Sequence, residues 1–108
     1  MKLLFKTPSP ESLKSSIFKK IEDKELQTWS ITESDGVKYL KHTQQWGEKG
    51  VIELTTDASR GGLLVEVLKF KGVNDEVKDF EGYYYGRFCE IIFVNFPLKF
   101  TSIDRIWH

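Results

Sequence analysis

The sequence is poor in cysteine and histidine, and neither charge is in excess. Cys89 is the only cysteine, so an intrachain disulfide is impossible. His42 and His108 are the only histidines and neither belongs to a metal-binding motif, so we expect no structural zinc and no bound cofactor. The 16 basic residues equal the 16 acidic ones, whereas nucleic-acid-binding domains are typically basic. We therefore expect no nucleic-acid partner.

Long apolar runs are also missing. No stretch approaches the roughly 20 apolar residues of a membrane-spanning helix. The apolar residues 3–5 near the start are too few for an export signal, which needs about seven or more. We therefore expect a cytoplasmic protein with no membrane partner.

What the sequence does contain is enough apolar material for one folded unit. Its 108 residues are 40% hydrophobic and 14% aromatic, and a chain of this length can bury a core without disulfides or metals. We expect a single α+β domain over residues 1–108.

The first elements are indicated by capping residues and by period. Residues 3–5 predict a short strand, and Ser9 followed by Pro10 predicts the start of a helix, with Ser9 as its N-cap. Leu13, Ile17 and Ile21 then recur every four residues, which indicates an amphipathic helix of about four turns.

A hairpin follows the helix. Residues 28–32 and 37–42 alternate with period two around Asp35-Gly36, a pair typical of a two-residue turn. This turn sets Trp29 opposite His42. The residues predicted to face the helices are Trp29, Ile31, Leu40 and His42.

Two further strands are predicted at residues 51–55 and 63–71, after a polar loop at 44–50 that carries Trp46. The second strand is apolar on both faces, which is typical of a central or covered strand and hints at a partner. One face carries Leu63, Val65 and Val67, and the other carries Leu64, Glu66, Leu68 and Phe70.

Residues 78–96 favour a helix over two extended segments, because most apolar residues fall on one arc at helical spacing. That arc comprises Phe80, Tyr84, Tyr85, Phe88, Cys89, Ile91, Ile92 and Phe93. Gly82 and Gly86 would lie on its flank, where another backbone could approach closely. A final strand is predicted at residues 100–107. The resulting order β-α-β-β-β-β-α-β predicts a mainly antiparallel sheet with two helices packed on one face.

The motifs of phosphate loops, nucleophile elbows and redox cysteine pairs do not occur. Cys89 fits a buried helix position better than a nucleophile. A non-catalytic role is therefore favoured, with an enzyme that uses His42 as acid or base as one alternative.

The leading hypothesis is a protein-interaction module that binds a protein partner or forms a homodimer. The zero net charge mildly favours self-association. The candidate binding residues are Tyr39, Leu64, Leu68 and Phe70 on the open sheet face, Trp46 in the polar loop, and Tyr83 and Arg87 on the polar side of the second helix. The alternative is a small-molecule site with an aromatic pocket formed by Trp29, His42 and Tyr84.

Overall fold

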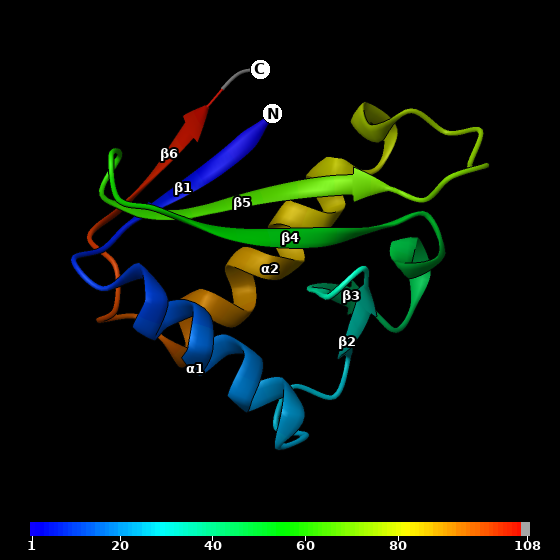
Figure 1. Ribbon diagram of the computed structural model, residues 1–108. Helices are drawn as coiled ribbons and strands as arrows, with labels where there is room; N and C mark the ends of the chain where they lie inside the picture. Colours follow the sequence, from blue (N-terminus) through cyan, green and yellow to red (C-terminus); the bar gives the residue numbers. More distant parts are fainter. Residues whose placement is uncertain (107–108) are drawn as a thin grey trace.

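The computed structural model describes residues 1–106, except for the side chain of Gln45 (Figure 1). Its strands and helices follow the predicted order β-α-β-β-β-β-α-β, which is confirmed. The elements are β1 (Lys2–Lys6), α1 (Pro10–Glu22), β2 (Trp29–Ser34), β3 (Val37–His42), the 3₁₀ helix η1 (Gln45–Glu48), β4 (Gly50–Asp57), β5 (Gly62–Lys69), the 3₁₀ helix η2 (Val77–Asp79), α2 (Glu81–Asn95) and β6 (Ser102–Ile106).

The strands form one antiparallel sheet in the order β2-β3-β4-β5-β1-β6. β5 is an interior strand between β4 and β1, as its two apolar faces predicted. β1 pairs with β6, so the two ends of the described chain lie side by side (Figure 1).

Both helices pack on the same face of the sheet, as predicted (Figure 1). Leu13, Ile17 and Ile21 of α1 are buried there against side chains of the middle strands. The other face of β4 and β5 has no helical cover (Figure 1). On β5, Leu63, Val65 and Val67 point into the core; the alternate residues, including Leu64, point to the uncovered face.

The start of α1 differs from the prediction in one detail. Ser9 is the N-cap residue and Pro10 is the first helical residue, but the Ser9 side chain makes no capping hydrogen bond. Instead, the Ser9 N–H donates to Thr7 Oγ1 at 3.2 Å. The turn before the helix is therefore stabilised by threonine.

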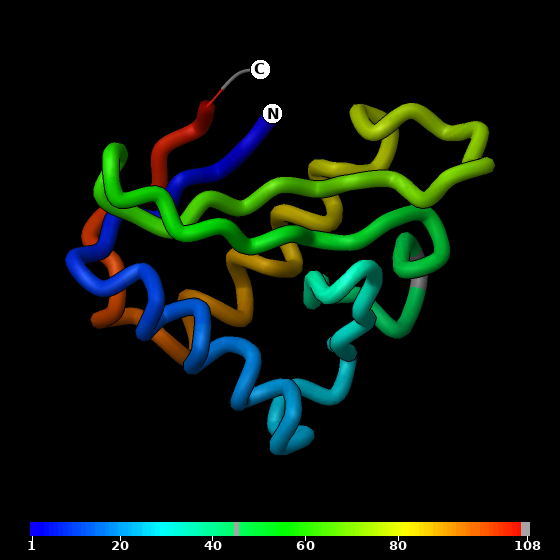
Figure 2. Tube along the Cα trace, viewed as in Figure 1, coloured from blue at the N-terminus to red at the C-terminus, as the bar shows by residue number. Residues whose placement is uncertain are grey.

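The β2–β3 hairpin has the predicted register. Trp29 lies opposite His42, and Asp35 and Gly36 have φ angles of 51° and 80°, the left-handed values that a tight hairpin turn requires. Only one residue pair, Leu40 with Ile52, joins β3 to β4. Because this junction is short, the hairpin leaves the plane of β4 and β5 and curls toward the helices (Figure 2).

Residues 78–96 are helical, so the alternative of two extended segments is wrong. Their main part is α2, with η2 before it. The predicted loop at 44–50 contains η1 and is therefore not irregular throughout. The final strand begins at Ser102, two residues later than predicted, and Trp107 and His108 lie outside the described residues. Within residues 1–106, no helix has the length and apolarity needed to cross a bilayer.

Candidate functional site

Four aromatic rings from four elements, β2, β3, η1 and α2, form a row. Tyr83 of α2 stacks on Trp46 of η1, with ring centroids 4.9 Å apart and planes 9° from parallel. Trp46 lies 6.0 Å from His42, and His42 lies 5.1 Å from Trp29 in an edge-to-face arrangement. The fold thus gathers Trp29, His42, Trp46 and Tyr83, which the sequence offered as members of two separate candidate sites.

Trp46 is held in this row by the tight turn of η1. The Gly47 N–H donates to the Gln44 carbonyl at 3.0 Å, and the Lys49 N–H donates to the Trp46 carbonyl at 2.9 Å. A Cβ atom at Gly47 would overlap the carbonyl oxygen of His42. Glycine therefore lets η1 lie directly on the end of β3, which brings Trp46 to Tyr83. Trp46 is half-buried as a result, between the two alternatives of a core residue and a freely exposed one.

His42 is buried, with only 6% of its surface exposed, and that small exposed part lines a depression at the surface. Nδ1 lies 2.9 Å from the Gln44 carbonyl and 3.2 Å from the Gln44 N–H, so one of these two hydrogen bonds forms in either tautomer. Nε2 makes no hydrogen bond within the described part of the chain. The ring lines a surface depression of about 330 Å³. Its lining residues are Thr28, Trp29, His42, Gln44, Arg87, Glu90 and Ile91.

Tyr84, the third residue of the predicted pocket, does not reach this depression. It is fully buried, and its hydroxyl accepts a hydrogen bond from the His42 N–H at 3.0 Å and donates to the Gly50 carbonyl at 2.7 Å. Burial raises the pKa of this hydroxyl. Tyr84 therefore holds the end of β3 against the start of β4 from beneath.

A second depression, of about 430 Å³, lies on the other side of Arg87 and Glu90. Its lining residues are Trp46, Gly82, Tyr83, Gly86, Arg87 and Glu90. Arg87 Nη1 donates to both carboxylate oxygens of Glu90 at 3.1 Å, an i,i+3 ion pair on the helix surface. No backbone approaches Gly82 or Gly86, contrary to expectation: a Cβ atom on either glycine would meet nothing within 4 Å.

The outward side of α2 continues this depression as an exposed strip, which we term the α2 face. It consists of Gly82, Tyr83, Gly86, Arg87, Glu90, Phe93 and Val94, all exposed. Tyr83 is 61%, Phe93 53% and Val94 77% exposed. The placement of Phe93 on the buried arc is therefore wrong: at helical spacing Phe93 lies about 140° around α2 from the buried Phe88. Val94 was missed, although its spacing of seven from Arg87 puts it on the polar side.

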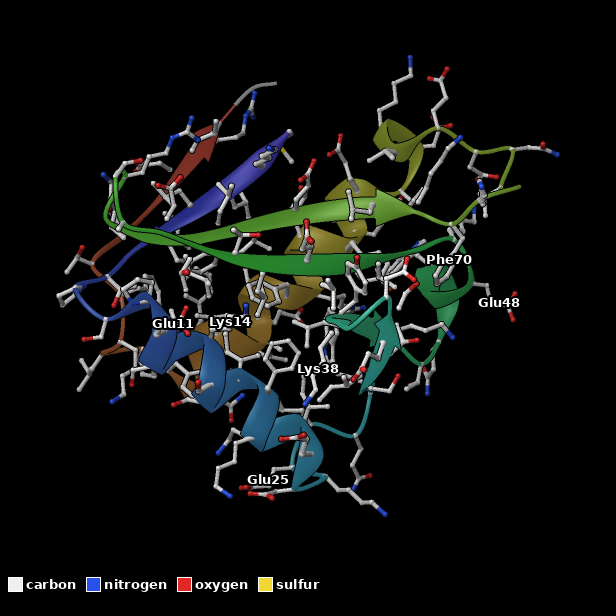
Figure 3. All side chains as sticks on the ribbon, viewed as in Figure 1. Glu11, Lys14, Glu25, Lys38, Glu48 and Phe70 are labelled. Atoms are coloured by element: carbon white, nitrogen blue, oxygen red, sulfur yellow. The ribbon has the colours of Figure 1, made fainter. Side chains whose placement is uncertain are left out.

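The candidate residues of the open sheet face are only partly together. Tyr39, Leu68 and Phe70 line a shallow cleft of about 250 Å³, with Val51 beside them. Phe70 follows the end of β5, on the side of the molecule where Glu48 projects outward (Figure 3). Leu64 does not line this cleft, because it lies four residues before Leu68 on β5, about 13 Å along the strand.

Charged side chains interrupt the sheet face between these apolar residues. Glu53 of β4 lies directly opposite Glu66 of β5, and Lys2 Nζ of β1 lies 3.7 Å from Glu66 Oε1. Like charges opposite one another on a sheet are destabilising. This face is thus less continuous in apolar character than the sequence suggested.

The remaining chemistry-bearing residues do not cluster. Within residues 1–106, no group of three or more histidine, cysteine or acidic side chains could hold a metal ion. Cys89 is half-buried, and burial raises the pKa of its thiol, which lowers its reactivity at neutral pH.

Comparisons of the chain with family models, with curated proteins and with solved structures found no match.

Proposed function

We propose that this chain is a non-catalytic protein-interaction domain and that the α2 face, with Trp46 at its edge, is its recognition surface. The observation that carries the proposal is the concentration of exposed apolar side chains on one helix. Of the five large exposed hydrophobic residues in the described part of the chain, Tyr83, Phe93 and Val94 belong to this one face. Scattered exposed apolar residues need no explanation, whereas their gathering at the two ends of one helix face, around the Arg87–Glu90 pair, is typical of a surface that binds a partner.

The composition of the face supports the same proposal. Tyrosine, tryptophan and arginine are enriched among residues that contribute most to protein–protein binding. The stack of Tyr83 on Trp46 holds both rings in one orientation before any partner arrives. Since fewer rotamers have to be ordered on binding, the entropic cost of association is lower.

The two glycines of the face also favour a docking role. Glycine within an exposed helix is less favourable than alanine by about 1 kcal/mol. No residue occupies the space next to Gly86, so the fold itself does not require a glycine there. An approaching partner would use that space.

Site-specific photo-crosslinking tests the proposal. A benzophenone side chain is placed at Val94 of the full chain, and as a matched control at Thr55, which is exposed on the sheet face. After irradiation in the native host cells, we expect protein adducts at position 94 and none at 55. Adducts at 55 alone, or at neither position, would contradict the α2 face as the recognition surface.

A second candidate function is small-molecule binding in the depression beside His42. It is favoured by His42 and Trp29, which line this depression together with the Arg87–Glu90 pair. A thermal-shift screen against metabolites, followed by the spectrum of the His42 ring in NMR, tests it. A stabilising compound that shifts the His42 ring signals, and that loses its effect in Glu90→Gln, would support this function. No stabilising compound, or one that leaves His42 unaffected, would contradict it.

An enzyme that uses His42 as acid or base remains a further alternative. His42 lines the same depression, but both hydrogen-bond options of Nδ1 involve the main chain of Gln44, and within the described residues no carboxylate forms an ion pair with the ring. The imidazole therefore lacks the charged partner that orients the histidine in catalytic triads. This arrangement supports the binding functions more than a catalytic one.

A further inference from the structure

The residues of the α2 face are spaced almost symmetrically about Phe88. Three pairs of its residues lie at equal distances along the helix on either side of Phe88: Gly82 with Val94, Tyr83 with Phe93, and Gly86 with Glu90. In each pair one member is large and the other is small, or both are aromatic. An antiparallel copy of the same helix, related by a two-fold axis, would place the members of each pair opposite one another.

We propose that the partner bound by the α2 face is a second copy of this chain, docked with its α2 antiparallel. This inference rests on the proposed function, because it assigns a partner to the same surface. It differs from the sequence hypothesis, in which self-association used the sheet face.

Shape complementarity supports this arrangement. Val94 is the most exposed of the three large hydrophobic residues of the face, and its counterpart on the second copy is Gly82, which has no side chain. Each Val94 thus fits a gap, and this happens twice because the arrangement is two-fold. Tyr83 meets Phe93 of the second copy at both ends, which forms two aromatic pairs across the interface. Trp46, stacked behind each Tyr83, fixes the position of that ring.

Charge complementarity supports it at the centre. Glu90 passes over Gly86 of the second copy, and Arg87 of that copy is the next residue along its helix. Two glutamates and two arginines therefore alternate around the two-fold axis. Each Glu90 keeps the Arg87 of its own helix, at 3.1 Å, and gains a second arginine from the other copy.

The predicted contact between the two α2 helices is small, so we expect a weak dimer. α2 has 15 residues and is therefore about 22 Å long. Two such helices with their flanking loops bury less than the roughly 1,200 Å² of a standard stable interface. We expect a reversible dimer with a dissociation constant on the order of 10 to 100 µM.

Sedimentation equilibrium of the purified full chain from about 10 to about 500 µM tests the inference. We expect the average mass to rise from that of one chain toward that of two. A single-chain mass throughout would overturn the inference. If Val94 nevertheless gave adducts with a different protein in cells, the proposed function would stand, and the two failures are thereby distinguished.

Charge variants test the geometry of the dimer. Arg87→Glu leaves four carboxylates at the centre, and Glu90→Arg leaves four guanidinium groups, so each variant alone should dimerise at least about tenfold more weakly. An equimolar mixture of the two variants pairs a copy that carries two glutamates with one that carries two arginines, so opposite charges again meet across the interface, and we expect heterodimers within about threefold of the original affinity. Glu53→Arg on the sheet face is the matched control and should leave the affinity unchanged. A dimer unaffected by both single variants, or weakened by Glu53→Arg, would overturn the inference.

Discussion

The hydroxyl of Tyr84 donates a 2.7 Å hydrogen bond to the carbonyl of Gly50, the first residue of β4. The same oxygen accepts from the His42 N–H, at the end of β3. β3 and β4 share only one paired position, so α2 supplies through this side chain a link that the strands themselves do not make. The positions of η1 and of the aromatic row therefore depend on a tyrosine in the core.

Removing the Tyr84 hydroxyl should lower the stability of the fold. Tyr84→Phe leaves a buried N–H and a buried carbonyl without their partner, and we expect the free energy of unfolding to fall by about 2 to 3 kcal/mol. Urea unfolding measures the change. Tyr83→Phe is the control, because Tyr83 is exposed and should cost less than about 0.5 kcal/mol. Equal losses in the two variants would show that the Tyr84 bridge contributes nothing.

Gly47→Ala should disturb the aromatic row locally. The new Cβ would overlap the His42 carbonyl, so η1 has to move away from β3. We expect a loss of about 2 to 4 kcal/mol in unfolding free energy, together with a change in Trp46 fluorescence as its stacking on Tyr83 is lost. Normal stability with an unchanged emission spectrum would contradict the close approach of η1 to His42.

The raised pKa of Tyr85 predicts that the folded state loses stability at alkaline pH. Burial raises its pKa to about 12, from an ordinary value of 10.0. Below pH 10 the tyrosine is protonated in both folded and unfolded chains, and stability does not depend on it. Between pH 10 and about 12 the unfolded chain loses the proton first, so stability falls by about 2 kcal/mol.

Unfolding by urea at about pH 9 and about pH 11.5 measures this loss. In Tyr85→Phe the decline should be shallower, although the variant is less stable at neutral pH because the Val67 N–H loses its acceptor. An equally steep decline in Tyr85→Phe would assign the effect to other groups, such as the buried Tyr84.

Gly86→Ala should separate folding from docking. Its Cβ would enter open space on a regular helix, so we expect the unfolding free energy of the dilute monomer to rise by up to about 1 kcal/mol. Self-association should weaken, because Glu90 of the second copy occupies that space. Gly72→Ala is the control: its φ of 85° disfavours alanine, and we expect a loss of about 1 kcal/mol. If Gly86→Ala associated as strongly as the original chain, Gly86 would not lie in the dimer interface.

The fold could be predicted from the sequence because local signals agreed with the tertiary structure. Asp35-Gly36 fixed the hairpin register, and the spacing of Leu13, Ile17 and Ile21 fixed the buried side of α1. The site could be predicted only in parts. Trp46 and Tyr83 were candidates, but their stacking depends on how closely η1 meets β3, which is a matter of tertiary packing.

The exposure of Phe93 was missed for a related reason. Helical periodicity places it one turn from the half-buried Cys89, at the edge of the apolar arc and about 140° around the helix from the buried Phe88. Phe93 contacts Phe100 at 5.8 Å on one side only, and 53% of its surface remains exposed. Sequence periodicity gives the direction of a side chain on a helix, but not which other segments of the fold cover it.

A dilution series monitored by ¹⁵N NMR tests most directly whether α2 of one copy docks on α2 of another. Amide signals are compared between about 1 mM and about 20 µM chain. We expect concentration-dependent shifts at Tyr83, Gly86 and Val94, and constant signals at Thr55 and Leu64 of the sheet face. Constant signals along α2, or shifts confined to the sheet face, would contradict the antiparallel α2 dimer.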